Sequence, residues 1–574
     1  MLVVDNGGDT IKFDLLPHHS LDSSDAKDAD PSATVVDPES MPNVTAKLQH
    51  QFTVLVGDEI NSVQPTQLGR LTRSMERGCI TDLGNQVQVW KRMLDRLQIQ
   101  VSLDSEAAQA FGWKVSRQKQ ATQSQYRPED MAVLLLLPPH FARSILDQVL
   151  YVWFQDFGFG HVGVATSSTY AGQRPETTLS SAESAASTGC SCVVDLGWGG
   201  TNIVPTYRQK PLSAVKRLPL GGRHMVNLWK HYCSYRQWNL MDAEFLLRDV
   251  QHQLAYVSTD PEGDFREAHC VPAGRRSFDR EYVLPDYQTV HEGSVRLSGY
   301  LRMQLRRQQA SEEKRQENER SKRNDDDKIA STDGTNKDKT NSKNEKSDDH
   351  DGDSENESGS ESESSEHDDA NGNSGKDKDD DDDKEEDDDA DSDNETDEQK
   401  RKRLMRMKAE EEQRQRELEM ERQVLDVSVE RFTIPEVLFR PVDVGLDPSM
   451  AGLPETIVQS VLACPEYFHA AMFESIVLVG GVSQLPNLQK RLETELRSLV
   501  PTEYEVKIRT VDDPIRCVWK EACSWVQRHS HETWSIHRTE FEQGMKGKGS
   551  TAFGVGKGAK PWFRLLADNG GMLV

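Results

Sequence analysis

Short apolar runs alternate with amphipathic stretches along the first 200 residues of the chain. The longest apolar run, residues 131–137, ends at two prolines and predicts a buried central strand. Apolar residues recur at helical spacing over residues 87–97 and 144–157, which predicts two helices. Buried strands that alternate with helices are typical of a mostly parallel sheet covered on both faces. The pattern therefore predicts the α/β fold class.

One strand–turn–strand phrase occurs twice. Residues 192–207 read CVVDLGWGGTNIVPTY and residues 3–13 read VVDNGGDTIKF, so each first strand leads into an aspartate and then glycines. Either turn alone has the plain interpretation of an ordinary hairpin. Two copies indicate duplicated architecture, and glycine turns let the backbone approach an anion closely. We expect Asp5 and Asp195 to face each other across a phosphate-binding gap, with Lys12 adding a positive charge.

Two further glycine pairs precede predicted helices. In residues 218–229 (LPLGGRHMVNLW) a pair ending at Gly222 opens a helix. In residues 474–495 (ESIVLVGGVSQLPNLQKRLETE) a pair beginning at Gly480 separates a strand from a helix. A glycine turn at a helix N-terminus is a recurrent phosphate or sugar site. A lone pair is a weak signal, and it gains weight here beside the two echoing turns.

Charge divides the chain into unlike parts. The formal net charge is −27, and most of the acid lies in residues 325–398, which are almost wholly Asp, Glu, Ser, Asn and Lys. Such a segment cannot bury enough apolar surface to offset its chain entropy. We therefore predict a disordered charged insertion over residues 301–423, helix-prone at its start. A mobile polar loop over residues 21–47 and a Gly- and Lys-rich tail over residues 544–574 also lie outside the predicted core.

These boundaries leave two predicted domains, one over residues 1–200 and one formed by residues 201–300 and 424–543. The eight cysteines are scattered and include no C-x-x-C pair, so we expect reduced thiols in an intracellular protein and no metal ligands. The longest apolar run is too short to cross a bilayer, and no signal peptide is expected, because Met1 leads directly into a strand. We expect no membrane partner.

The charged segments each allow two interpretations. The acidic tract at residues 325–398 is either a solvated insert with no specific role or a tract that attracts strongly basic histones at low salt. The basic run KRKRLMRMK at residues 400–408 is either a nuclear localisation signal or a patch that neutralises the neighbouring acids. Composition alone does not choose between them.

The glycine turns, taken in order, resemble a known family. The segments VVDNGGDTIKF, VVDLGWGGTNIVPTY, LPLGGRHM and VLVGGVSQLPNLQKRL stand in the order of actin's two phosphate loops and its adenosine-binding segments. Four other segments resemble a nuclear subfamily of the actin-related proteins: residues 234–258, 281–293, 430–446 and 499–508. The resemblance covers most of the chain outside the insertion, the polar loop and the tail.

This resemblance implies an actin-like fold, in which two duplicated α/β domains enclose a nucleotide cleft. It implies ATP or ADP, with Mg²⁺, as the ligand. The positions that match the family's binding segments are Asp5, Asn6, Gly7, Lys12, Asp195, Gly197, Gly199, Gly200, Gly222, Gly480 and Gly481.

Other positions depart from the actin pattern. Asp9 replaces a loop glycine, Trp198 replaces an aspartate that helps to organise the metal, and Asn202 replaces a histidine near the attacking water. Phosphoryl transfer needs a metal clamp and a positioned water. We therefore predict no catalytic residues and little or no ATP hydrolysis, with nucleotide bound structurally, weakly or not at all. The remaining departures are Val164 for a water-orienting glutamine, Gln251 and His252 for a lysine and a glutamate at adenosine, and Leu485 for a stacking tyrosine.

The resemblance also implies a nuclear role. This subfamily is a subunit of SWR-type (SRCAP-type) chromatin remodelling complexes, which exchange a histone variant into nucleosomes and carry a separate helicase-type ATPase. We therefore expect remodeller subunits as partners, histones as candidate partners of residues 325–398, and a nuclear location with the cytoplasm as a second site. The alternative is a nucleotide-dependent ATPase or filament-forming actin-like protein. We expect no filament, because the long insertion would hinder stacking.

Overall fold

The computed structural model describes residues 1–17, 37–49, 53–99, 101, 126–171, 189–208, 210–287, 290–309, 311–312, 405–408, 411 and 423–546. The chain divides into two compact units. The first consists of Met1–Arg302 with Met420–Val574, and the second of Met303–Glu419. All strands named below belong to the first unit.

The first large sheet is built around the N-terminal hairpin. β1 (Leu2–Asn6) pairs antiparallel with β2 (Thr10–Leu15) and parallel with β9 (Ala132–Leu137). All six residues of β9 are buried, so the long apolar run is the central strand that its sequence predicts. The full order is β20-β10-β9-β1-β2-β3, in which the remaining strands are β3 (Glu39–Pro42), β10 (His161–Thr166) and β20 (Ile536–His537).

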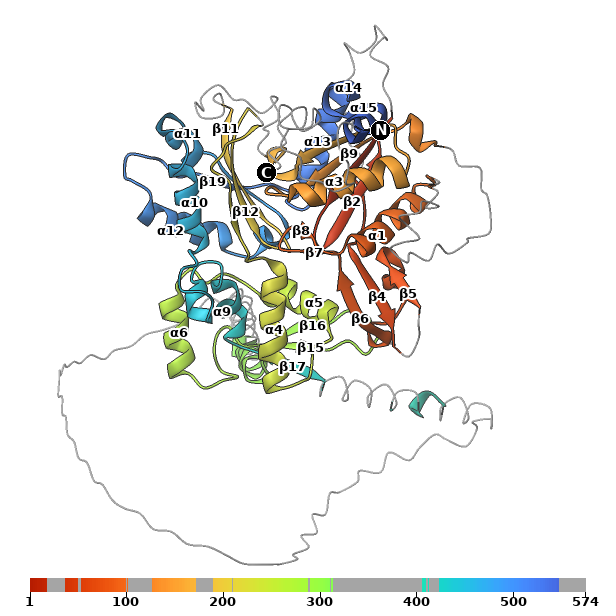
Figure 1. Ribbon diagram of the computed structural model, residues 1–574. Coiled ribbons are helices and arrows are strands. Elements are labelled where there is room, and N and C mark those ends of the chain that lie inside the picture. The colour runs from red at the N-terminus through yellow and green to blue at the C-terminus, as the bar shows by residue number, and fades with distance from the viewer. Residues whose placement is uncertain are drawn as a thin grey trace, which may run out of the picture. The chain divides into compact units, whose positions relative to one another are not determined.

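The second large sheet repeats this plan. β11 (Cys190–Leu196) pairs antiparallel with β12 (Thr201–Tyr207) and parallel with β18 (Ile476–Val479). The order is β13-β12-β11-β18-β19, with β14 also paired to β12; these are β13 (Lys210–Pro211), β14 (Lys216–Leu218) and β19 (Ile508–Thr510). Figure 1 shows the two hairpins in red and in yellow. The sequence echo thus marks a duplicated sheet, and the predicted α/β fold class with two similar halves is confirmed.

The described residues of the first unit also form three smaller sheets. They are β5-β4-β6, formed by Val54–Val56, Val44–Leu48 and Leu68–Arg73; β16-β15-β17, formed by Ser294–Leu297, Arg280–Val283 and Val424–Val427; and the hairpin of β7 (Met75–Glu76) and β8 (Cys79–Ile80).

The mobile loop predicted over residues 21–47 is wrong in its second half. Residues 39–47 form β3 and most of β4. Their apolar positions are few, but Met41, Val44 and Ala46 are each at most 1% exposed. The polar composition concealed this burial, which in β4 extends over Val44, Thr45 and Ala46 in succession. Residues 18–36 lie outside the described part of the chain.

Helices flank both large sheets (Figure 1). The predicted helix at residues 87–97 is α1, which begins earlier because Asp82 accepts a hydrogen bond from the Asn85 amide as an N-cap. The predicted helix at residues 144–157 is α3, continued by a π-helical turn. The helices are α1 (Leu83–Arg96), α3 (Arg143–Tyr151), α4 (Gly222–Arg236), α5 (Glu244–Leu254), α6 (Pro261–Cys270), α9 (Glu430–Glu436), α10 (Leu453–Leu462), α11 (His469–Phe473), α12 (Leu488–Leu499), α13 (Cys517–Arg528), α14 (His531–Trp534) and α15 (Arg538–Lys546).

One buried cluster joins the two large sheets. It contains Val3 of β1, Val193 of β11 and Val477 of β18, packed with Trp519 of α13. The Trp519 indole also donates a hydrogen bond to the Val3 carbonyl at 3.1 Å. This shared core holds the ends of the two echoing hairpins side by side, and so fixes where their turns meet.

The predicted insertion and tail are described only in part. Residues 299–309 are helical, as predicted for the start of the insertion, and most of residues 313–422 lie outside the described chain. The tail was predicted to start at residue 544, but residues 544–546 are the last residues of α15, which ends at Lys546. Among the described helices, none has the length and apolar content needed to cross a membrane.

Gly163 in β10 should not tolerate a larger side chain. A Cβ there would lie 2.5 Å from Trp534 Cε3 and 2.7 Å from the Trp534 carbonyl oxygen. We expect Gly163→Ala to lower the free energy of unfolding by about 1–3 kcal/mol through overpacking, measured by urea denaturation. Gly299→Ala is the control, because its Cβ would meet its nearest neighbour at 3.7 Å. Equal stability of the two variants would contradict the packing of α14 on β10.

Candidate functional site

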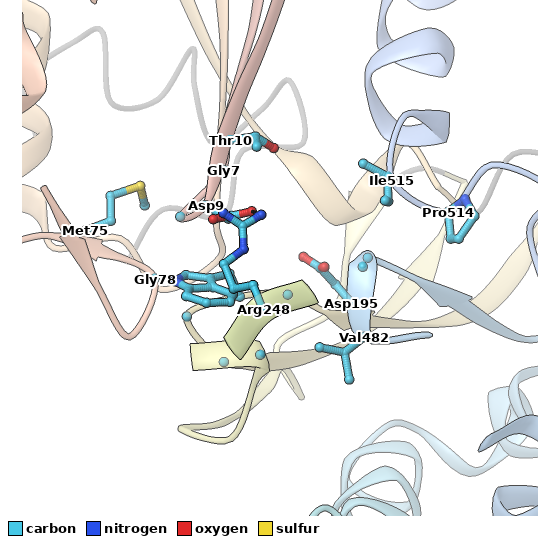
Figure 2. A pocket seen from close by; sticks show the side chains of 18 of the residues that line it. Gly7, Asp9, Thr10, Met75, Gly78, Asp195, Arg248, Val482, Pro514 and Ile515 are labelled. Atoms are coloured by element: carbon cyan, nitrogen blue, oxygen red, sulfur yellow. Dashed lines mark hydrogen bonds and ion pairs between the residues drawn. The ribbon is translucent and has the colours of Figure 1, made fainter. Parts of the chain in front are cut away.

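The two echoing turns open into one cavity of about 900 Å³. Figure 2 shows the side chains of Asp9 and Asp195 in this pocket, from the first and the second turn. All the positions matched to the family's binding segments line it: Asp5, Asn6, Gly7, Lys12, Asp195, Gly197, Gly199, Gly200, Gly222, Gly480 and Gly481. The structure therefore brings together segments that are as much as 476 residues apart, from Asp5 to Gly481, as the repeated phrase predicts.

The first turn carries a buried ion pair. Lys12 Nζ lies 2.7 Å from Asp5 Oδ2, and the two residues are 7% and 8% exposed. Burial alone would lower the pKa of Lys12, but Asp5 outweighs it, and the pKa of Lys12 is raised with a smaller contribution from Asp195. Lys12 is therefore a fixed positive charge at the floor of the cleft.

Asn6 lines the cavity and is also held by its neighbours. Its side-chain oxygen accepts hydrogen bonds from Trp90 Nε1 at 3.0 Å and from Gln86 Nε2 at 3.1 Å, both on α1. Its side-chain nitrogen donates to Met75 Sδ of β7 at 3.2 Å. Asn6 therefore anchors the first turn to α1 and to β7.

Asp195 is buried at the end of β11. Burial raises its pKa to about 6, and the nearby Asp5 charge adds to this, while a hydrogen bond from Ser168 Oγ at 3.2 Å opposes it. Asp5 and Asp195 both line the cavity, so the two aspartates face one cleft. This is the arrangement on which the sequence prediction depends.

Glycine is required where β18 turns into the cleft. Gly480 has φ +91°, and a Cβ there would collide with the Leu196 carbonyl. The first backbone amides of α4 form hydrogen bonds with the second turn and are not free to bind a ligand. The amides of Gly222 and Arg223 donate to the carbonyls of Gly197 and Trp198 at 3.1 and 3.0 Å. These two helix N-terminal amides are therefore used within the protein.

The departures from the actin pattern change the chemistry of the cleft. Asp9 is flanked by Arg73 at 3.1 Å and Arg248 at 2.8 Å, and Figure 2 shows Arg248 reaching toward Asp9. The Trp198 ring lies under both guanidinium groups, with centroid distances of 4.7 and 5.3 Å. The negative charge of Asp9 is thus neutralised by Arg73 and Arg248, which no motif in the sequence points to.

Arg217 closes the opposite part of the cleft. Its Nε donates to Asn202 Oδ1 at 2.9 Å, and its Nη1 donates to the Arg77 carbonyl at 3.1 Å. Its Nη2 donates to the Pro139 carbonyl. This single side chain links β14 and β12 of the second sheet to the β7–β8 hairpin and to the end of β9.

Of the remaining positions that depart from the actin pattern, three line the cavity and one does not. Gln251, His252 and Leu485 line the cavity. Val164 belongs to the buried core of the first domain instead. The sequence analysis did not identify Arg73, Arg217 and Arg248, because single charged residues on strands and helices carry no local pattern. Only their contacts in the folded chain reveal them.

The donor set fits a phosphate chain better than it fits a metal. Glycine turns, Lys12 and the cavity volume would accommodate a nucleotide, whose phosphates Lys12 would contact. Trp198 brings an indole into the turn where a metal-bound triphosphate needs a carboxylate. Among the described residues, no group of three or more His, Cys, Asp or Glu side chains is placed to hold a metal ion.

The raised pKa of Asp195 predicts that this residue lowers the free energy of unfolding by an amount that depends on pH. At a pH between these two pKa values, Asp195 is protonated in the folded protein, whereas in the unfolded chain, where its pKa is near the ordinary 3.8, it is ionised. Ionised Asp195 therefore destabilises the fold above pH 6, and the cost declines as the pH falls from 6 towards 4. We expect Asp195→Asn to resist urea better than the parent at pH 7.5, by up to about 3 kcal/mol, and the difference to narrow at pH 5.

Asp5→Asn serves as the matched control for this experiment. It leaves Lys12 buried without its carboxylate, so we expect it to be less stable than the parent at both pH values. An Asp195→Asn protein that is less stable than the parent at pH 7.5 would contradict the assigned cost. Both measurements use nucleotide-free protein.

Comparison with known proteins agrees with this geometry. The family model for actin matches residues 2–547. The chain is 26% identical to actin-related protein 6 of Oryza sativa subsp. indica over 550 residues, covering 95% of this chain and 96% of that protein. It is 25% identical to actin-related protein 6 of Arabidopsis thaliana over 552 residues (95% and 96%) and of Dictyostelium discoideum over 569 residues (95% and 92%). The chain belongs to the actin family.

Proposed function

We propose that this protein is a non-catalytic actin-related subunit of a nuclear chromatin remodelling complex, one that exchanges a histone variant into nucleosomes. In this role the actin-like body docks partners, and nucleotide binds weakly or as a structural ligand, if it binds at all. A ligand that binds the native state alone stabilises the fold without being turned over.

The observation that carries the non-catalytic part is the pairing of Asp9 and Trp198. They come from the two phosphate loops, and both are engaged by Arg73 and Arg248. An indole has no oxygen with which to ligate a metal or to accept a hydrogen bond from metal-bound water, and phosphoryl transfer depends on a metal clamp and a positioned water. In addition, Asn202 stands where actin has a histidine near the attacking water, and its side-chain oxygen accepts a hydrogen bond from Arg217.

The remodelling part rests on family resemblance. Relatives similar along nearly the whole chain are named actin-related protein 6, and segments in both halves of the second domain resemble that nuclear subfamily. Residues 325–398 would attract basic histones, and residues 400–408 would serve nuclear import. Both segments lie largely or wholly outside the described residues.

A nucleotide-dependent ATPase or filament former is the second candidate. The observation that favours it is the intact arrangement of Asp5, Lys12 and Asp195 around the 900 Å³ cavity. The two candidates differ in turnover, which can be measured directly.

We expect the purified full-length protein to hydrolyse ATP no faster than a buffer blank, because the metal-organising carboxylate is absent. Phosphate release with Mg²⁺ and ATP measures this, and analysis of the denatured protein reports any co-purified nucleotide. Turnover well above the blank that Asp195→Ala abolishes would establish the ATPase instead. Sedimentation in the same buffer checks for filaments.

Removal of the acidic tract should weaken histone binding. We expect replacement of residues 325–398 by a Gly/Ser linker of equal length to reduce affinity for histone dimers on the order of tenfold or more at low salt. The loss should shrink as salt rises, because screening already weakens the parent. The affinity is measured over a salt series, with replacement of residues 21–36 by a Gly/Ser linker as control. Unchanged affinity would leave the tract as a solvated insert.

A further inference from the structure

Four charged side chains from three distant segments meet at one side of the cleft. Arg73, at the end of β6, lies 3.1 Å from Asp9 Oδ1 and 2.7 Å from Glu244 Oε1. Arg248, one turn further along α5 than Glu244, lies 2.8 Å from Asp9 Oδ2. Asp9 thus offers one oxygen to each arginine. We call Asp9, Arg73, Glu244 and Arg248 the cleft latch.

The latch joins parts of the first unit that belong to different substructures. β6 lies in the β5-β4-β6 sheet, whereas α5 packs against α4, which begins at the second phosphate loop. Figure 1 labels β6 and α5 in these two regions, in orange and yellow-green. Asp9 itself comes from the turn of the first large sheet. Opening of the cleft between β6 and α5 would therefore have to break the latch.

The Trp198 ring packs against the two arginines of the latch. The guanidinium carbons of Arg73 and Arg248 lie 4.7 and 5.3 Å from its ring centroid. Planar guanidinium groups stack favourably on an indole face. The ring also lies over Gly222, where a Cβ would come within 2.9 Å of it. The second phosphate loop and α4 are thereby connected to the same cluster.

Burial makes these contacts strong. The Arg73 side chain is 4% exposed and that of Glu244 is 13% exposed. Burial would raise the pKa of Glu244, but Arg73 outweighs it, and with Lys230 it holds that pKa below the ordinary value. Exposed ion pairs contribute little to stability. Removal of one partner from a buried pair is costly, because it leaves a buried charge uncompensated.

We propose that the cleft latch holds the two walls of the cleft together when no nucleotide is bound. Asp9 acts as an internal anion: its carboxylate occupies two arginines as a bound oxyanion would. A cleft closed in this way needs no ligand to bridge its walls. The latch is a property of the chain itself, so it does not depend on the remodelling role proposed above.

Amide hydrogen exchange of the full chain without nucleotide tests the latch. Asp9→Asn and Arg248→Gln are the variants, because these side chains are 21% and 29% exposed and their loss should leave the protein folded. We expect exchange in β4–β6 and in α5 to accelerate together by about tenfold or more, the effect of losing a charge-assisted hydrogen bond. The double variant should exchange little faster than either single variant, because both remove one shared contact.

Arg92→Gln is the matched control. Arg92 forms ion pairs of similar exposure with Asp58 and Glu59 at 2.8 and 3.3 Å, between α1 and the short helix Gly57–Ser62. We expect it to alter exchange near those two helices and not in α5. Unchanged exchange in β4–β6 of Asp9→Asn would overturn the proposal. Equal acceleration in α12 would overturn it as well, because it would mean a loss of global stability and not an opening of the cleft.

Discussion

Burial forces the charges of the cleft into pairs, and these pairs connect the segments that enclose it. The Lys12 ammonium is buried and therefore requires Asp5, and the same positive charge moderates the cost of burying Asp195. Asp9, which lies in the same turn, is compensated by Arg73 and Arg248. Together with the shared apolar core, these ion pairs connect the two hairpins, β6 and α5 around the cleft.

The large-scale fold could be predicted because duplication leaves a pattern in the sequence. The echo of residues 3–13 in residues 192–207 predicts two hairpins of one kind, and each pairs with a buried parallel strand, β9 or β18. Residues 39–47 were misjudged because three buried apolar side chains, beside the buried Asn43 and Thr45, suffice to make strands of a polar segment whose partners lie elsewhere. β3 lies at the edge of its sheet and β4 at the centre of the β5-β4-β6 sheet, and in both cases neighbouring strands supply the hydrogen bonds.

The candidate site was predictable from its glycines and aspartates, and not from its arginines. Gly480 could be predicted as a site residue because only glycine fits the backbone conformation of this turn. Asn6 lines the cavity, and its hydrogen bonds to Gln86 and Trp90 could not be read from the sequence. Arg73 and Arg248 stand alone in their segments, and nothing in the sequence relates them to Asp9. Long-range ion pairs arise from the tertiary fold, so local patterns miss them.

The central claim is that Asp9 and Trp198 convert a nucleotide cleft into one that the protein closes for itself. Calorimetric titration of Mg·ATP into the parent and into an Asp9→Gly, Trp198→Asp double variant tests it most directly. The account predicts that the double variant, with the actin residue types restored, binds Mg·ATP at least about tenfold more tightly, a gain of about 1.4 kcal/mol. Equal or tighter binding by the parent would contradict it.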